Sequence, residues 1–95
     1  MNETELACRK GSNARFVRLI RQDDGTIRME TQDLGGAAIA GEDEYEFWVT
    51  VAPDELATLA FELLRERFAG RLDAVDAFRD WCKAHAIAHK FDNWI

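Results

Sequence analysis

Hydrophobic and polar residues alternate most regularly over residues 44–51, where the chain reads Glu-Tyr-Glu-Phe-Trp-Val-Thr-Val. In an extended chain successive side chains point to opposite faces. One face therefore carries Tyr45, Phe47, Val49 and Val51, and the other carries Glu44, Glu46, Trp48 and Thr50. The pattern predicts a β-strand that buries its Tyr, Phe and Val side and exposes its Glu and Trp side.

A β-hairpin is predicted over residues 15–31, where two β-prone runs flank the dipeptide Asp24-Gly25. This dipeptide accepts the positive φ that a tight turn requires. A two-residue turn would pair Ile20 with Met29, whereas a three-residue turn that includes the preceding Asp would pair Leu19 with Met29. A slip of one residue exchanges the two faces of a strand, so both registers stay open.

Two helices are predicted after the strand. Pro53 suits the first helical position, where its missing N–H costs nothing, and the two acids after it suit the positive end of the helix dipole. An apolar stripe at helical spacing follows, made of Leu56, Leu59, Ala60, Leu63, Leu64 and Phe68. Gly70 ends this helix, and Asp73 is the N-cap of a second helix that ends within residues 84–90. Residues 86–95 either continue that helix or form a short strand or extended tail, the version we favour.

These elements define an α+β fold, in which a small antiparallel sheet of three to four strands (hairpin 15–31 plus strand 44–51) is packed by two C-terminal helices. The length of 95 residues leaves room for a single domain over residues 1–95. Residues 1–13 are polar and mixed, and we expect them to be flexible.

The ends of the chain and its cysteines bear on location. Acids stand near the N-terminus where a secretory signal carries positive charge. No apolar run approaches the roughly 20 residues of a membrane helix, so no membrane association is expected. Cys8 and Cys82 are expected to be free thiols, because a chain that is not exported stays in a reducing compartment. The cytoplasm is the expected location.

Candidate chemistry is sparse. Cys82, His85 and His89 would share one face if the second helix continued through them, and a thiolate with two imidazoles suits zinc. We expect Cys82 to be buried packing instead, because it continues the apolar stripe of Phe78. The glycines at 35–36 lack the Lys-Ser/Thr of a phosphate loop. The sequence therefore predicts no metal, no cofactor and no enzymatic activity.

Charge is distributed unevenly along the chain, whose net charge is −6. Residues 1–22 carry a local +3, residues 23–56 a local −9, and residues 57–95 no net charge. The acidic segment includes the predicted binding residues Glu42, Asp43, Glu44, Glu46 and Trp48. An exposed tryptophan among acids suits a basic partner protein, so we predict a small acidic binding or regulatory module. The alternative for Trp48 is burial beneath a loop or the C-terminal tail.

A second functional hypothesis comes from the basic hairpin Arg15–Arg28. Basic side chains interleaved with aromatic ones on a sheet bind single-stranded nucleic acid, although the acidic excess makes this partner the less favoured one. A homodimer is a further arrangement, because small sheets leave open edges; Ile39 or the Trp94-Ile95 end would contribute to it.

Overall fold

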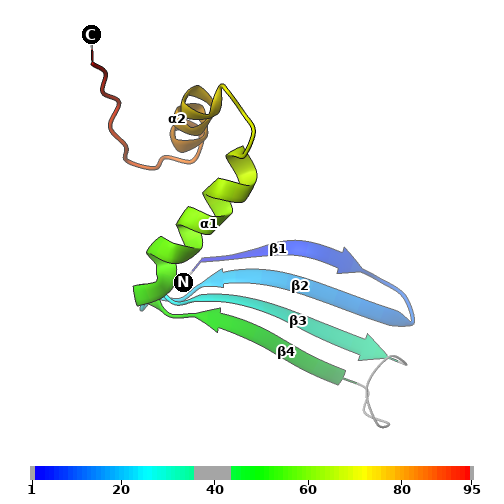
Figure 1. The fold of residues 1–95 in the computed structure, drawn as a ribbon. Coiled ribbons are helices and arrows are strands. Elements are labelled where there is room, and N and C mark those ends of the chain that lie inside the picture. Colours follow the sequence, from blue (N-terminus) through cyan, green and yellow to red (C-terminus); the bar gives the residue numbers. More distant parts are fainter. Residues whose placement is uncertain (1, 36–43, 95) are drawn as a thin grey trace. The chain divides into compact units, whose positions relative to one another are not determined.

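The computed structural model describes residues 2–35 and 44–94 and places four strands before two helices (Figure 1). The elements are β1 (Asn2–Arg9), β2 (Asn13–Arg21), β3 (Ile27–Gly35), β4 (Glu44–Val51), the 3-10 turn η2 (Pro53–Glu55), α1 (Leu56–Phe68) and α2 (Ala74–Ala84). The predicted α+β class, an antiparallel sheet followed by two helices, is confirmed. The strand predicted over residues 44–51 is confirmed at both of its ends.

The chain divides into two compact units, Met1–Thr58 and Leu59–Ile95. We call the first the sheet unit and the second the helical unit. The organisation of residues 1–95 as one domain stays a prediction.

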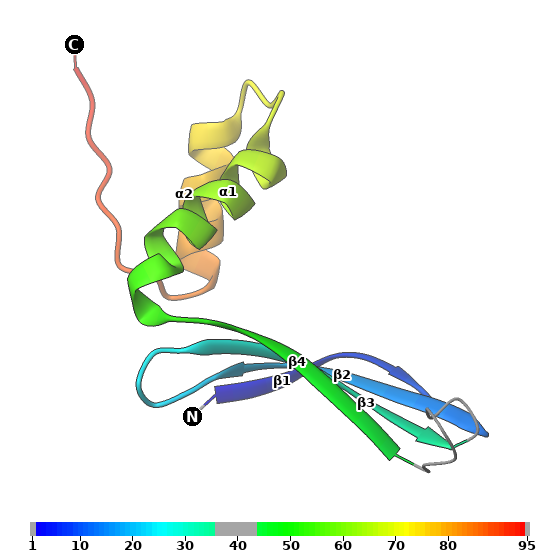
Figure 2. The same cartoon turned by 60° about the horizontal axis from the view of Figure 1, so that its bottom comes forward.

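The sheet unit contains one four-stranded sheet in the order β1-β2-β3-β4, with every neighbouring pair antiparallel. Each strand therefore pairs with the strand that follows it in the sequence. Figure 2 shows the twist of the sheet along its strands. Among the described strands, β1 and β4 form the two edges.

Strand β1 occupies residues that the sequence predicts to be flexible. Asn2–Arg9 pairs with β2 from Asn2↔Arg21 to Arg9↔Arg15, with a register shift between Glu5 and Ala7. Every side chain of β1 is exposed. The strand is held by backbone hydrogen bonds to β2 rather than by burial of an apolar face. Its sequence therefore needs no hydrophobic alternation, and none predicted it.

The β2–β3 hairpin adopts the register of the three-residue turn. Leu19 pairs with Met29, so the alternative pairing of Ile20 with Met29 is wrong. Gly25 N donates to Gln22 O at 2.9 Å and Gln22 N donates to Thr26 O at 2.9 Å. Gly25 has φ +92°, the left-handed conformation that follows the type I turn of such a hairpin.

The register assigns the sheet's side chains to two faces, because paired residues share a face. The charged face carries Glu3, Arg18, Ile20, Arg28, Glu30, Glu46 and Trp48. The apolar face carries Val17, Leu19, Ile27, Met29, Tyr45, Phe47, Val49 and Val51. Burial within the sheet is confined to its centre, where Ile20 is 7% exposed.

The apolar side of β4 is more exposed than the sequence predicts. Tyr45 and Phe47 are 40% and 42% exposed, so the prediction that they are buried is wrong. Their rings pack against each other with centroids 5.4 Å apart. Because β4 is an edge strand among the described residues, it has a neighbouring strand on one side only, and its side chains have correspondingly few neighbours.

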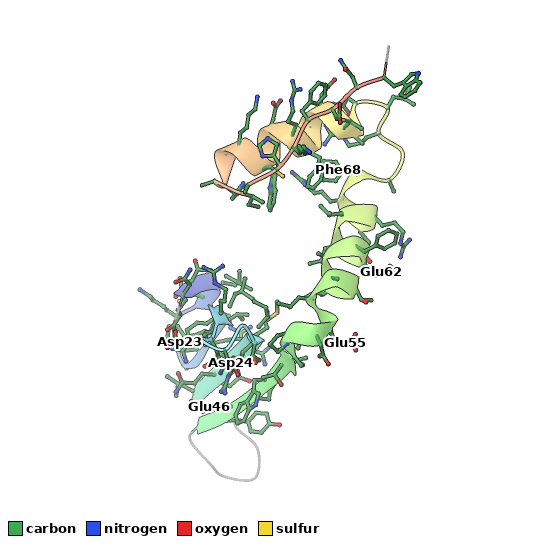
Figure 3. All side chains as sticks on the ribbon, turned by 90° about the vertical axis from the view of Figure 1, so that its left-hand side faces the viewer. Asp23, Asp24, Glu46, Glu55, Glu62 and Phe68 are labelled. Atoms are coloured by element: carbon green, nitrogen blue, oxygen red, sulfur yellow. The ribbon has the colours of Figure 1, made fainter. Side chains whose placement is uncertain are left out.

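The helical unit contains most of α1, all of α2 and the C-terminal tail. Pro53 starts η2, and Gly70 with φ +77° follows the end of α1, as predicted. The rings of Phe68, labelled in Figure 3, and Phe78 have centroids 5.8 Å apart and join α1 to α2. Asp73 stands at the N-cap of α2, although its carboxylate binds Arg71 rather than the helix backbone.

The tail after α2 is extended. Helix α2 ends at Ala84, within the predicted range, and residues 87–94 form neither helix nor strand. The guanidinium carbon of Arg79 lies 4.3 Å from the centroid of the Phe91 ring and connects the tail to α2. Of the alternatives for residues 86–95, the extended tail is the one found up to residue 94.

Candidate binding surface on strand β4

The predicted binding residues are only partly within the described structure. Glu42 and Asp43 lie outside the described residues, and Glu44 is placed by its backbone pairing with Leu34. Glu46 pairs with Gln32, and Trp48 pairs with Glu30. Because Glu46 and Trp48 are two positions apart on one strand, they share the charged face.

Both of these side chains are exposed. Glu46 lies on β4, as Figure 3 shows, and Trp48 is 50% exposed. The alternative in which Trp48 is covered by a loop or by the C-terminal tail stays a prediction. The strand therefore offers an acid and an aromatic ring on the same face of the sheet's edge.

Arg28 covers part of the Trp48 ring. Its guanidinium carbon lies 4.2 Å from the ring centroid, the geometry of a cation–π contact. The Arg28 Nε also donates to Glu30 Oε1 at 3.1 Å. One arginine thus joins the exposed tryptophan to the carboxylate at the centre of the sheet.

Glu30 is the centre of an ion-pair network on the charged face. It is only 9% exposed and accepts hydrogen bonds from both Arg18 and Arg28. Arg18 also donates to Glu3 Oε1 at 3.0 Å, which extends the network to β1. The hydrogen bond that Arg18 donates to Glu30 is the main reason that the pKa of Arg18 is raised. A buried carboxylate is tolerated here because two guanidinium groups compensate for its lost hydration.

A separate ion pair occupies the other side of the sheet. Arg15 Nε and Nη2 donate to the two carboxylate oxygens of Asp33 at 2.6 and 2.7 Å. This bidentate hydrogen bonding is the main cause that holds the pKa of Asp33 below its ordinary value. The guanidinium carbon of Arg15 also lies 5.7 Å from the Phe47 ring centroid.

The basic residues of the hairpin do not form one continuous basic surface. Arg15 and Arg18 lie on opposite faces of the sheet. Arg15, Arg18 and Arg28 each pair with a carboxylate. Their positive charge is therefore largely balanced by acids of the same sheet.

The sulfur and imidazole groups considered for metal binding do not converge. Cys82 is 3% exposed, which fits the expected packing role, and it lines a small groove together with His89. The His85 ring instead stacks on Trp81 at 4.2 Å, and its Nδ1 lies 2.8 Å from Trp81 O. Within the part of the chain that the structure describes, no group of three or more His, Cys, Asp or Glu residues is placed to hold a metal ion.

Sequence reasoning missed two features of this surface. The first is β1, whose Glu3 reaches Arg18. The second is the burial of Glu30, which reads in the sequence as one more acid of a polar strand. The available signal was opposite charge at paired positions, since Arg18 pairs with Glu30 in the register of the three-residue turn. That signal could be used only after the register was known.

Comparison with known proteins gives no match to a family model, to a curated protein or to a solved structure. In the described part of the chain, no helix has the length and apolar character to cross a membrane. The interpretation of the β4 surface therefore depends on its own geometry and charge.

Proposed function

We propose that this chain is a non-enzymatic binding module whose strand β4 engages a basic surface of a partner protein. The observation that carries the proposal is the half-exposed Trp48 on the same face as Glu46, at an edge of the sheet formed by the described strands. Tryptophan is enriched among the residues that dominate binding energy at interfaces. A large aromatic ring that is half exposed is suited to such a role.

Charge supports a basic partner in particular. Residues 23–56 carry a local charge of −9, and strand β4 contributes two acids and no base to it. Opposite charge accelerates encounter and disfavours acidic competitors. The two free thiols agree with a reducing compartment, and we propose the cytoplasm as the place of action.

Single-stranded nucleic acid is the less supported partner. Binding phosphates through Arg15, Arg18 and Arg28 would require these side chains to exchange their carboxylate partners for phosphate. A salt titration with a single-stranded oligonucleotide tests this alternative. Affinity that falls steeply with salt concentration would favour it, and absence of binding at low salt would remove it.

The proposed function is tested by capture from a native lysate with mass spectrometry, using the wild-type chain and the double variant Glu44→Lys/Glu46→Lys. The matched control is Glu62→Lys/Glu66→Lys, which makes the same charge change on α1. We expect the β4 variant to lose a basic protein that the wild type and the control both retain. The association rate of that protein with the β4 variant is expected to be lower. Identical captured proteins for all three chains would contradict the proposal.

A further inference from the structure

We infer that β4 binds its basic partner by strand addition, taking up an extended basic segment as a fifth strand of the sheet. This inference rests on the proposed function and specifies how the partner is held. An edge strand presents a row of backbone N–H and C=O groups, and pairing with them gives affinity, while alternate side chains give specificity.

The two edges of the described sheet differ in how they are protected against such pairing. Strand β1 has an irregular register between Glu5 and Ala7, and its side chains include Glu3 and Arg9. Bulges and charges of this kind are the devices by which proteins block an edge. The edge at β1 is therefore poorly suited to accept another strand.

Strand β4 has no such irregularity, and its charged residues are two glutamates near its start. Its register with β3 runs without a shift from Ile27↔Val51 to Leu34↔Glu44. It has eight residues, contains no proline, lysine or arginine, and six of the eight are aromatic or β-branched. Regular geometry and high β-propensity leave an edge that is ready to pair.

Charge selects the occupant of this edge. A second copy pairing through its own β4 would bring together two strands that each carry two glutamates and no base, so neither strand would offer a cation to the carboxylates of the other. The glutamates would face each other in a parallel pairing and would face valines in a fully overlapping antiparallel one. Opposite charges at paired positions stabilise a sheet. A basic segment therefore fits this edge better than a second copy does. An eight-residue strand is about 26 Å long, so a segment of similar length would cover it.

The structure also indicates where the basic residues of the segment lie. Arg28 already occupies one side of the Trp48 ring, so a cation of the segment beside Trp48 would have to share the ring with Arg28. The most favourable place for a cation is therefore beside Glu46. On the opposite face, apolar residues would cover Phe47 and Val49, which are exposed.

Synthetic peptides test the inference directly. The probe is an eight-residue peptide of alternating Lys and Val with blocked ends, and its control has Glu in place of Lys. Two further versions carry N-methyl groups, one on all Val amides and one on all Lys amides. Only alternate amides of an added strand point toward its neighbour. We therefore expect one methylated version to bind like the parent and the other to lose affinity about tenfold or more, because each methyl group removes a backbone hydrogen bond.

Binding is followed by calorimetry and by NMR of the isotope-labelled full chain. Strand addition is expected to slow hydrogen exchange at alternate amides of β4 and to leave β1 amides unchanged. Glu46→Lys is expected to weaken the Lys/Val peptide, whereas Glu62→Lys on α1 is expected to have no effect.

The other outcomes separate the two proposals. If both methylated peptides bind like the parent and Glu46→Lys abolishes binding, strand addition is overturned while the charge-based function stands. If the parent peptide does not bind, strand addition by a basic segment is overturned, and the lysate comparison decides the function. If β4 amides are protected without peptide and the mass in solution is that of a dimer, a second copy is the occupant and the inference is overturned.

Discussion

Arg28 and Trp48 lie on neighbouring strands, and the guanidinium carbon of Arg28 is 4.2 Å from the centroid of the Trp48 ring. Arg28 is bound at the same time to Glu30. The arginine therefore has two neighbours, a carboxylate that fixes its position and an aromatic ring that it covers. Arg28 therefore links the buried Glu30 to the proposed binding surface. We expect the charge of this one residue to affect how strongly the surface binds a cation.

Replacement of Arg28 is expected to strengthen binding of a basic peptide. Arg28→Gln removes a cation that competes for the Trp48 ring, and it makes the charged face one unit more negative. We expect the affinity for the Lys/Val peptide to rise by about twofold to fivefold, less than the tenfold that corresponds to 1.4 kcal/mol. Calorimetry measures the change. Arg65→Gln, which breaks an ion pair with Glu62 on α1, is the control, and a weaker or unchanged affinity for Arg28→Gln would contradict the prediction.

Glu30 is expected to matter more for stability than Glu3, although both bind Arg18. Glu30 is buried and shared by two arginines, whereas Glu3 is exposed on the edge strand. Glu30→Gln is expected to lower the free energy of unfolding by about 1–2 kcal/mol, since it weakens two charge-assisted hydrogen bonds. Glu3→Gln is expected to cost less than about 0.5 kcal/mol, as for other exposed ion pairs. Urea unfolding followed by circular dichroism compares the two variants. Equal losses of unfolding free energy would contradict the expectation that the buried carboxylate contributes more than the exposed one.

The Arg15–Asp33 pair predicts a pH dependence of stability. Arg15 lowers the pKa of Asp33 through two hydrogen bonds. A carboxyl whose pKa is lower in the folded state stabilises the fold while it is charged. This contribution is complete above the unfolded value of about 4 and is lost as the pH falls through the lower folded value.

Asp33→Asn is therefore expected to lower the free energy of unfolding at neutral pH and to flatten its decline below about pH 4. Arg15→Gln is expected to have the same two effects. The double variant is expected to lose little more unfolding free energy than either single variant, because both substitutions remove the same interaction. Urea midpoints across this pH range provide the measurement. Parallel profiles for the wild type and Asp33→Asn would refute the assignment.

Two glycines with positive φ are expected to differ in their tolerance of alanine. A Cβ at Gly25 would lie in ordinary contact with Pro53, 3.5 Å from its Cγ, whereas a Cβ at Gly35 would lie 2.0 Å from Ser12 O. Gly25→Ala adds only backbone strain and is expected to cost about 1 kcal/mol. Gly35→Ala adds a clash with backbone as well and is expected to cost about 3 kcal/mol or more. Thermal unfolding ranks the two variants, and the reverse order would contradict the packing at Gly35.

Local patterns in the sequence predicted the elements that local physics determines. The alternation of residues 44–51 gave a strand with its observed ends, and Pro53 and Gly70 marked the limits of the first helical segment. The hairpin register was not determined locally, because both turns fit Asp24-Gly25. The structure has the three-residue turn, in which Gly25 has a positive φ and the oppositely charged Arg18 and Glu30 pair across β2 and β3.

The rest depended on pairing between distant residues. Strand β1 is held by its backbone and by the ion pair of Glu3 with Arg18, neither of which leaves a hydrophobic pattern. Burial of Tyr45 and Phe47 was expected from alternation alone, which identifies a face but not what covers it. Glu46 and Trp48 were correctly grouped on one face because strand geometry alone places them there.

The regular β4 edge also has a consequence for handling the purified chain. The negative charge of β4 disfavours edge-to-edge pairing of two copies. Salt screens such repulsion between exposed charges, and the screening length is about 3 Å at molar concentration. High salt concentration is therefore expected to promote reversible self-association of the chain through β4, and low salt concentration is expected to keep the chain monomeric.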